Sequence, residues 1–190
     1  MKSYSVSILL IFSMTISFGQ RSLLPIDSIS GYVSYTQIEK IDSVSANDLF
    51  NRAETWFAKT YNSSNDVVQK SDKENFTIIG KGQMKAHAQN FGARSWGYIK
   101  YTISIYCKEG RYKCVISDFI HEGDKFATAS TYQPSVGLFT KTTPQATGMS
   151  GYRAKDFDRI CQELNEKVTK LLSSLSSSMS KKLESKSDDW

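Results

Sequence analysis

Two kinds of hydrophobic spacing run through this chain and divide it into predicted helices and strands. Apolar residues recur at helical intervals along two segments, which predicts two amphipathic helices, each with one buried side. The first is expected at residues 46–60, after Ser45 as N-cap with Asp48 three residues later. Its apolar side comprises Leu49, Phe50, Ala53, Trp56 and Phe57. The second carries Phe157, Ile160, Cys161, Leu164, Val168, Leu171, Leu172 and Leu175.

Five further segments are rich in β-branched and aromatic residues and predict strands, at residues 30–41, 66–70, 75–87, 97–108 and 111–121. The last two form the best-defined pair. A two-residue turn at Glu109-Gly110 pairs residue 107 with 112, 105 with 114 and 103 with 116. Both apolar sets then lie on one face, so turn length and alternation agree on the register.

The order β-α-β-β-β-β-α predicts a two-layer α+β domain, an antiparallel sheet with both helices on one face. We expect this single domain at residues 30–178. An N-terminal linker at residues 20–29 precedes it and a polar C-terminal tail at residues 179–190 follows it. Residues 122–153 lack periodicity and are expected to form a long loop within the domain; loops of this length are uncommon and tend to be functional or disordered.

The N-terminus has the pattern of a secretory signal peptide at residues 1–19. Lys2 precedes an apolar run at residues 6–16, which is too short to span a membrane, and Ser17-Phe18-Gly19 predicts cleavage before Gln20. We therefore expect an exported protein, periplasmic or extracellular, with no transmembrane segment and no cofactor. The chain has 24 Lys+Arg against 19 Asp+Glu; this mild excess biases it toward anionic partners without indicating nucleic acid.

The odd number of cysteines leaves at least one thiol unpaired within the chain. In the predicted hairpin register, Cys107 and Cys114 are diagonal neighbours about 7–8 Å apart, beyond the usual disulfide separation. Cys161 lies on the apolar side of the second helix. We expect three buried thiols that act as core residues.

Two segments resemble a known family: GYVSYTQIEKIDSVSANDLFNRAETWFAKTYNSSNDVVQKSDKENFTIIGKG and GYIKYTISIYCKEGRYKCVISDFIHEG, within residues 31–123. They are similar to the exported Bacteroidota proteins grouped as domain of unknown function 4468, which has a TATA-binding-protein (TBP)-like fold. The resemblance implies the β-α-β-β-β-β-α order and no catalytic residues, and it is weakest at residues 122–153. Nucleic-acid binding is not expected, because such readers use two repeats and apolar wedges, whereas this chain has one repeat and an export signal.

One polar cluster stands out as a candidate for catalysis. Asp118, His121 and Glu122 lie close together in the sequence, and the hairpin register puts Asp118 opposite Tyr101 on the core side. A carboxylate there needs a partner, which is a structural role as well as a catalytic opportunity. Zinc spacings and nucleophile motifs are absent from the sequence, so we expect no metal site and no assigned catalytic residue.

The outward side of the predicted sheet supplies the candidate binding residues Lys81, Lys100, Tyr106, Lys113 and Phe119. Such a face binds an anionic or glycan-like ligand or a protein, or is merely solvated, or is covered by the long loop through Phe126, Tyr132, Leu138 and Phe139. Two functions remain open. The first is a non-enzymatic binding or interaction module of the cell envelope. The alternative is an envelope or extracellular hydrolase that uses the Asp118, His121 and Glu122 cluster.

Overall fold

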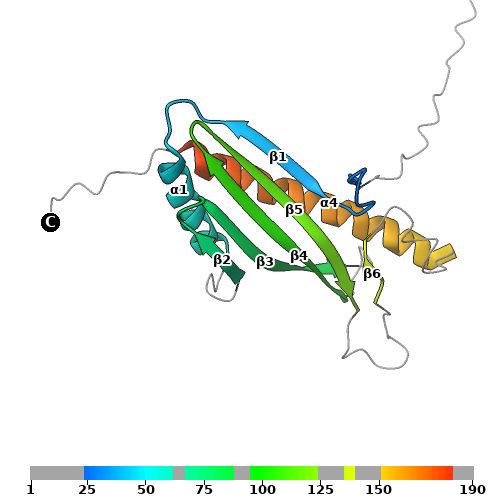
Figure 1. Ribbon diagram of the computed structural model, residues 1–190. Helices are drawn as coiled ribbons and strands as arrows, with labels where there is room; N and C mark the ends of the chain where they lie inside the picture. The colour runs from blue at the N-terminus through cyan, green and yellow to red at the C-terminus, as the bar shows by residue number, and fades with distance from the viewer. Residues whose placement is uncertain (1–23, 62–66, 88–94, 124–134, 140–150, 182–190) are drawn as a thin grey trace, which may run out of the picture.

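The computed structural model describes residues 24–61, 67–87, 95–123, 135–139 and 151–181. The predicted signal peptide and the loop residues Phe126 and Tyr132 lie outside these ranges. Two long helices lie behind an antiparallel six-stranded sheet, whose front face no described helix covers (Figure 1). The elements are β1 (Tyr35–Lys40), α1 (Ala46–Thr60), β2 (Val68–Asp72), β3 (Thr77–His87), β4 (Ser95–Lys108), β5 (Arg111–Glu122), β6 (Gly137–Leu138) and α4 (Gly151–Ser180). The predicted α+β layering is confirmed, and the predicted elements follow in the expected order, with the two-residue β6 added inside the predicted loop.

The strands lie in the order β1-β5-β4-β3-β2, and the short β6 pairs with the far end of β5. The β4–β5 hairpin has the predicted register, since Cys107 lies opposite Tyr112, and Ile105 opposite Cys114. Gly110 occupies the turn at a φ of 66°, in the left-handed region that glycine adopts without strain. Turn length and alternation therefore suffice to fix this pair.

Helix α1 begins and ends where its pattern predicts. The Ser45 side chain accepts a hydrogen bond from the Asp48 N–H at 3.0 Å, which satisfies one of the helix's unpaired N–H groups. Trp56 and Phe57 are both buried in the core. On β3, Gly80 leaves the space for the Phe57 ring, because a Cβ at that position would lie 2.7 Å from the ring.

Helix α4 is 30 residues long and runs the length of the sheet (Figure 1). Ile160, Leu164, Val168 and Leu175 are completely buried on its sheet side. It extends beyond the predicted helical core at both ends, and Met179 near its C-terminus is also fully buried. The buried guanidinium of Arg52 on α1 donates to the Met179 carbonyl, which fixes the two helices to each other.

The three cysteines are buried and none forms a disulfide, as predicted. Burial raises the pKa of Cys107 to about 12, and that of Cys114 likewise. Thiolates are the reactive form, so these two thiols are held inert at neutral pH.

Strand β5 departs from the predicted alternation at Asp118. Thr102 lies opposite Ser117 but Lys100 lies opposite Ile120, so β5 has one extra residue between them, a β-bulge. Asp118 occupies this bulge at a φ of 56°. The extra residue reverses the faces beyond it: Asp118 is exposed, whereas Phe119 is 1% exposed and belongs to the core. The expectations of an inward Asp118 and an outward Phe119 are therefore wrong.

The segment before β1 also packs on the domain. Ile26 forms an isolated antiparallel bridge with Val33, and Leu24 and Ile26 contact the core from a region expected to be a linker. Within the predicted loop, Phe139 stacks on Phe157 with 5.6 Å between ring centroids, so it lies on the helix side of the sheet. Phe139 therefore does not cover the front face.

Candidate functional site: the open face of the sheet

The strand registers map the side chains on the open face into rows that run across the strands. Among the strand residues that the structure describes, eight basic ones lie on this face: Lys40, Lys70, Lys81, Lys85, Lys100, Lys108, Arg111 and Lys113. Of the acidic residues in the described strands, three share it: Asp72, Asp118 and Glu122. Two of these are neutralised locally, because Asp72 lies 3.0 Å from Lys70 and Glu122 lies 2.8 Å from Lys100. The face therefore has a strong positive excess.

The excess of positive charge is concentrated beside the β4–β5 turn. Lys40 lies opposite Arg111, and Arg111 lies opposite Lys108, so three cations from three strands form one row. Lys113 belongs to the next row of the same face, between Ile38 and Tyr106. Like charges directly opposite each other destabilise a sheet. We call Lys40, Lys108, Arg111 and Lys113 the basic row cluster.

None of these four cations forms an ion pair within the described part of the chain. A shallow depression of about 360 Å³ lies over Ile38, Tyr106, Lys108, Arg111, Tyr112 and Lys113. Ile38 is 64% exposed and Tyr106 38% exposed, so apolar surface is available beside the positive charges. The combination suits a ligand that carries both anionic groups and a hydrophobic surface.

A second depression, of about 980 Å³, is lined by residues from both faces of the sheet. Lys81, Gln83, Lys100 and Asp118 contribute to its lining, together with Tyr61 and Tyr101. The two tyrosine hydroxyls are 3.1 Å apart, and burial raises the pKa of each, which keeps them protonated. Of the expected binding residues, Lys81, Lys100, Tyr106 and Lys113 are thus exposed on the open face, and Phe119 is not.

The three residues of the hydrolase hypothesis point in different directions. His121 is fully buried on the helix side, where its Nδ1 accepts from the Val136 N–H at 3.1 Å. Its Nε2 donates to the Trp96 carbonyl at 2.6 Å, and burial lowers its pKa below the ordinary value. Asp118 is exposed, and Glu122 pairs with Lys100 on the open face. The three side chains do not converge on one cleft.

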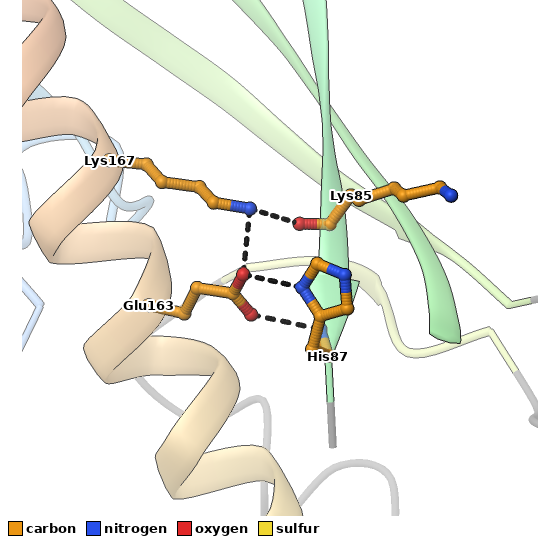
Figure 2. A network of polar contacts seen from close by, with 4 residues as sticks. All are labelled: Lys85, His87, Glu163 and Lys167. Carbon is orange, nitrogen blue, oxygen red and sulfur yellow. Dashed lines mark hydrogen bonds and ion pairs between the residues drawn. The ribbon is translucent and has the colours of Figure 1, made fainter. Parts of the chain in front are cut away.

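The other histidine, His87, belongs to a polar network that joins β3 to α4 (Figure 2). Glu163 accepts the His87 backbone N–H at 2.9 Å and contacts its Nδ1 at 2.7 Å. Lys167 lies 2.7 Å from Glu163 and donates to the Lys85 carbonyl at 2.7 Å. Two helix side chains thus satisfy main-chain groups at the end of β3, which closes that part of the sheet edge.

Burial alone would raise the pKa of Glu163. Hydrogen bonds from Lys167 and His87 outweigh burial and hold the pKa below its ordinary value. Among the described residues, no group of three or more His, Cys, Asp or Glu side chains is placed to hold a metal ion. The described helices include none that is long and apolar enough to cross a membrane.

The sequence did not predict the part of the open face where the positive charge is most concentrated. Lys40 and Arg111 were not among the candidate residues, because their adjacency depends on the pairing of β1 with β5. Lys108 and Arg111 flank the two-residue turn, and the predicted register already put them opposite each other. Two basic residues on either side of a tight turn were the available signal.

Three comparisons relate the chain to known proteins. Residues 35–122 match the model of a domain of unknown function with a TBP-like fold (DUF4468). A TBP-like protein from Parabacteroides distasonis is 18% identical, with a TM-score of 0.56 over 80% of this chain and 96% of that one. A DUF4468 family protein from Bacteroides ovatus is 12% identical, with a TM-score of 0.56 over 79% and 90%. No curated protein matches the chain. The fold and the resemblance to this family are confirmed.

Proposed function

We propose that this chain, which carries a DUF4468 segment in a TBP-like fold, is an exported, non-enzymatic binding module whose open sheet face holds an anionic, glycan-like partner at the cell envelope. The observation that carries the proposal is the basic row cluster. Three like charges in one cross-strand row, without counterions among the described residues, work against the stability of the sheet. A surface arranged in this way is explained by an anion that it binds.

The apolar residues beside the basic row cluster favour a ligand that has an apolar surface as well as negative charge. Tyr106 and Ile38 flank Lys113 in the same cross-strand row, within the depression over that end of the sheet. A tyrosine ring offers an apolar face and a polar hydroxyl, which suits a sugar ring or an amphipathic segment. The hydrolase alternative has no comparable support, because His121 is buried and hydrogen-bonded at both ring nitrogens.

Binding to a labelled dextran sulfate, with neutral dextran as the reference polymer, tests the anionic part of the proposal. The double variant Lys108→Gln, Arg111→Gln should bind dextran sulfate about tenfold more weakly, since two contacting cations are lost. Lys59→Gln, Lys73→Gln makes the same charge change at exposed positions off the face and is the matched control. Equal losses in both variants would mean that only net charge matters, and the proposed site would be wrong.

Export is the other part of the proposal, and it is motivated by the signal-peptide pattern that ends at Gly19. We expect the protein recovered from its own host to begin at Gln20. N-terminal sequencing measures this directly. Recovery of intact chains from Met1 in the cytoplasm would contradict export.

A further inference from the structure

Strand β1 forms one edge of the sheet, and half of its main chain faces away from β5 (Figure 1). The Ile41 N–H donates to the Gly110 carbonyl at 2.9 Å, so the odd-numbered residues of β1 point their N–H and C=O groups toward β5. The even-numbered residues Thr36, Ile38 and Lys40 therefore point theirs outward. Within the described ranges, no backbone hydrogen bond reaches these outward groups.

This free edge has defined ends. On the N-terminal side, the Ser34 N–H donates to the Pro25 carbonyl at 3.0 Å, so residue 34 already has an outward partner. On the C-terminal side, β1 ends at Lys40, and Ser43 adopts a φ of 62° in the turn that follows. The outward main chain of β1 is therefore free over a short stretch centred on Ile38.

Ile38 makes this stretch unusual for a sheet edge. Its side chain is 64% exposed, on the open face and between the outward groups of its own strand. Edge strands are commonly protected from pairing by charges, proline or a bulge, whereas an exposed apolar residue invites it. A second strand beside β1 would bury the isoleucine and satisfy the free main-chain groups at the same time.

The edge is complementary to itself. When a second copy pairs antiparallel to β1 about a two-fold axis at Ile38, the two isoleucines lie opposite each other. Thr36 of each copy then lies opposite Lys40 of the other, so all the outward groups of the free stretch are paired. On the helix side, Gln37 of each copy lies opposite Glu39 of the other, an amide beside a carboxylate. This register opposes no like charges.

Neighbouring registers are less favourable. An axis one residue farther along puts Glu39 opposite Glu39 of the second copy, and the next puts Lys40 opposite Lys40. Like charges directly opposite each other destabilise a sheet. An axis one residue earlier leaves Lys40 opposite Ser34, whose outward N–H already donates to Pro25. Charge and the length of the free stretch therefore both select the axis at Ile38.

The helix side of the edge has room for the second copy. A groove of about 420 Å³ runs between β1 and α4, and Glu39 is the one charged residue in its lining: Gln37, Glu39, Thr169, Leu172, Ser173, Ser176 and Ser177. The Glu39 carboxylate accepts hydrogen bonds from the Tyr112 and Ser176 hydroxyls, each at 2.8 Å. The carboxylate is thus held at the groove, where the Gln37 amide of the second copy can donate to it.

The basic row clusters of two such copies do not prevent this pairing. Lys113 lies in the row of Ile38, so three strand spacings, about 14 Å, separate it from Lys113 of the second copy. This exceeds the Debye length of about 8 Å at physiological ionic strength, and the repulsion across solvent is largely screened.

We propose that the free edge of β1 is a homodimer interface, in which two copies pair their β1 strands antiparallel about Ile38 and form one continuous sheet. The helices of both copies then lie on one side of the sheet and both open faces on the other. Two basic row clusters share that open side, so one polyanion can contact both; this last consequence alone rests on the proposed function.

Sedimentation equilibrium tests the dimer without any ligand, in the chain that lacks its predicted signal peptide. The interface is short, so we expect a weak dimer with a Kd on the order of 10–100 μM. Ile38→Lys puts two cations at the axis and should weaken association by about tenfold or more. Ile120→Lys makes the same change at another exposed isoleucine of the open face, away from the edge, and is the matched control.

A chain that remains monomeric up to about 1 mM would overturn the proposal. Equal weakening by the two lysine variants would mean that only net charge matters, and unchanged association of Ile38→Lys would assign the dimer to another surface. Either result would contradict pairing at β1.

A cross-link tests the register. The two Ile38 residues form a hydrogen-bonded pair with a Cα separation of about 5.5 Å, which suits a disulfide. Ile38→Cys should therefore form a covalent dimer readily, and the native thiols are buried. In Thr36→Cys the two introduced thiols are about 14 Å apart along the strands, so this control should react slowly. Equal rates would contradict the register.

Amide hydrogen exchange shows what covers the edge. We expect the Ile38 amide to exchange slowly at concentrations where the dimer is populated and to exchange fast after dilution. Protection that persists in the dilute monomer would assign the edge to another part of the same chain and overturn the proposal.

Discussion

The two faces of the sheet are made by alternate residues of the same strands, yet they have opposite properties. On β4 and β5, Ile103, Ile105, Cys114 and Ile116 face the helices and are completely buried. Their immediate neighbours Ser104 and Val115 are half-buried, and Lys113 is exposed. The inner side is fixed by the need to fill space beneath two helices. The outer side has no such constraint, which leaves it available for charge and for binding.

The comparison of the two faces predicts that truncating a buried residue on the inner side causes the largest loss of stability. Leu164→Ala on α4 should reduce the free energy of unfolding by about 2–5 kcal/mol, because it leaves a cavity at a site with no exposure. Tyr106→Ala on the open face removes a larger side chain and should cost less than about 1 kcal/mol. Denaturant titration measures both. Similar losses would mean that the open face is packed after all.

A smaller loss of stability is expected when a methyl group is added on the inner side, at a glycine that has no room for it. A Cβ on Gly82 would lie 2.4 Å from Cζ of Tyr101, directly across in β4. Gly82→Ala should therefore cost about 1–3 kcal/mol through overpacking. The same change in a Tyr101→Leu background should cost less, since the ring is gone. Equal costs in thermal or denaturant unfolding would show that the ring moves aside freely.

The α4 network at the end of β3 predicts a pH-dependent effect. The folded-state pKa of Glu163 is lowered, so its contribution is present above the unfolded-state pKa, near 4.3, and is lost as pH falls through the folded-state value. Because the side chain is only partly buried and solvent screens its ion pairs, Glu163→Gln should cost only about 0.5–1 kcal/mol at pH 7. Unfolding curves from pH 7 to pH 3 should show this difference disappear. A difference that grows on acidification would contradict the assignment.

The smallest expected effect has the opposite sign. Arg111 lies between Lys40 and Lys108 in the basic row cluster, so Arg111→Gln should raise stability by about 0.2–0.5 kcal/mol at low salt. Screening at about 1 M salt should remove the gain. Thermal unfolding at two salt concentrations measures this. A loss of stability at low salt would mean that Arg111 serves the fold, and would weaken the comparison between the faces.

The sequence predicted the inner face well because two independent constraints agreed there. In the β4–β5 hairpin, the turn length and the alternation both require Cys107 opposite Tyr112. Helix α1 was bounded by a cap and by the amphipathic period. At the ends of β1 and β2 the alternation was the only constraint, and the observed boundaries differ from the predicted ones by one to five residues.

The bulge at Asp118 could not be derived from alternation, because alternation assumes that no residue is inserted. Aspartate tolerates the left-handed conformation better than most residues, which is a weak local signal. A stronger signal of the bulge was that simple alternation put Phe119, a large apolar residue, on the outer face. The basic row cluster was hidden for a different reason: β1 and β5 are separated by three strands in the sequence, and their pairing is a property of the sheet order.

Helix α4 has a consequence for when the protein can fold. It is the most C-terminal of the described elements, and at about 45 Å it lies along the whole sheet. Glu163, near the middle of the helix, binds the end of β3, and Arg52 holds the C-terminal end of the helix at Met179. Until synthesis has passed Met179, the strands lack the surface that buries them, so their long-range pairing is not yet rewarded. The strands therefore stay unpacked until late in synthesis, which is the state that the proposed export would require for passage through a membrane.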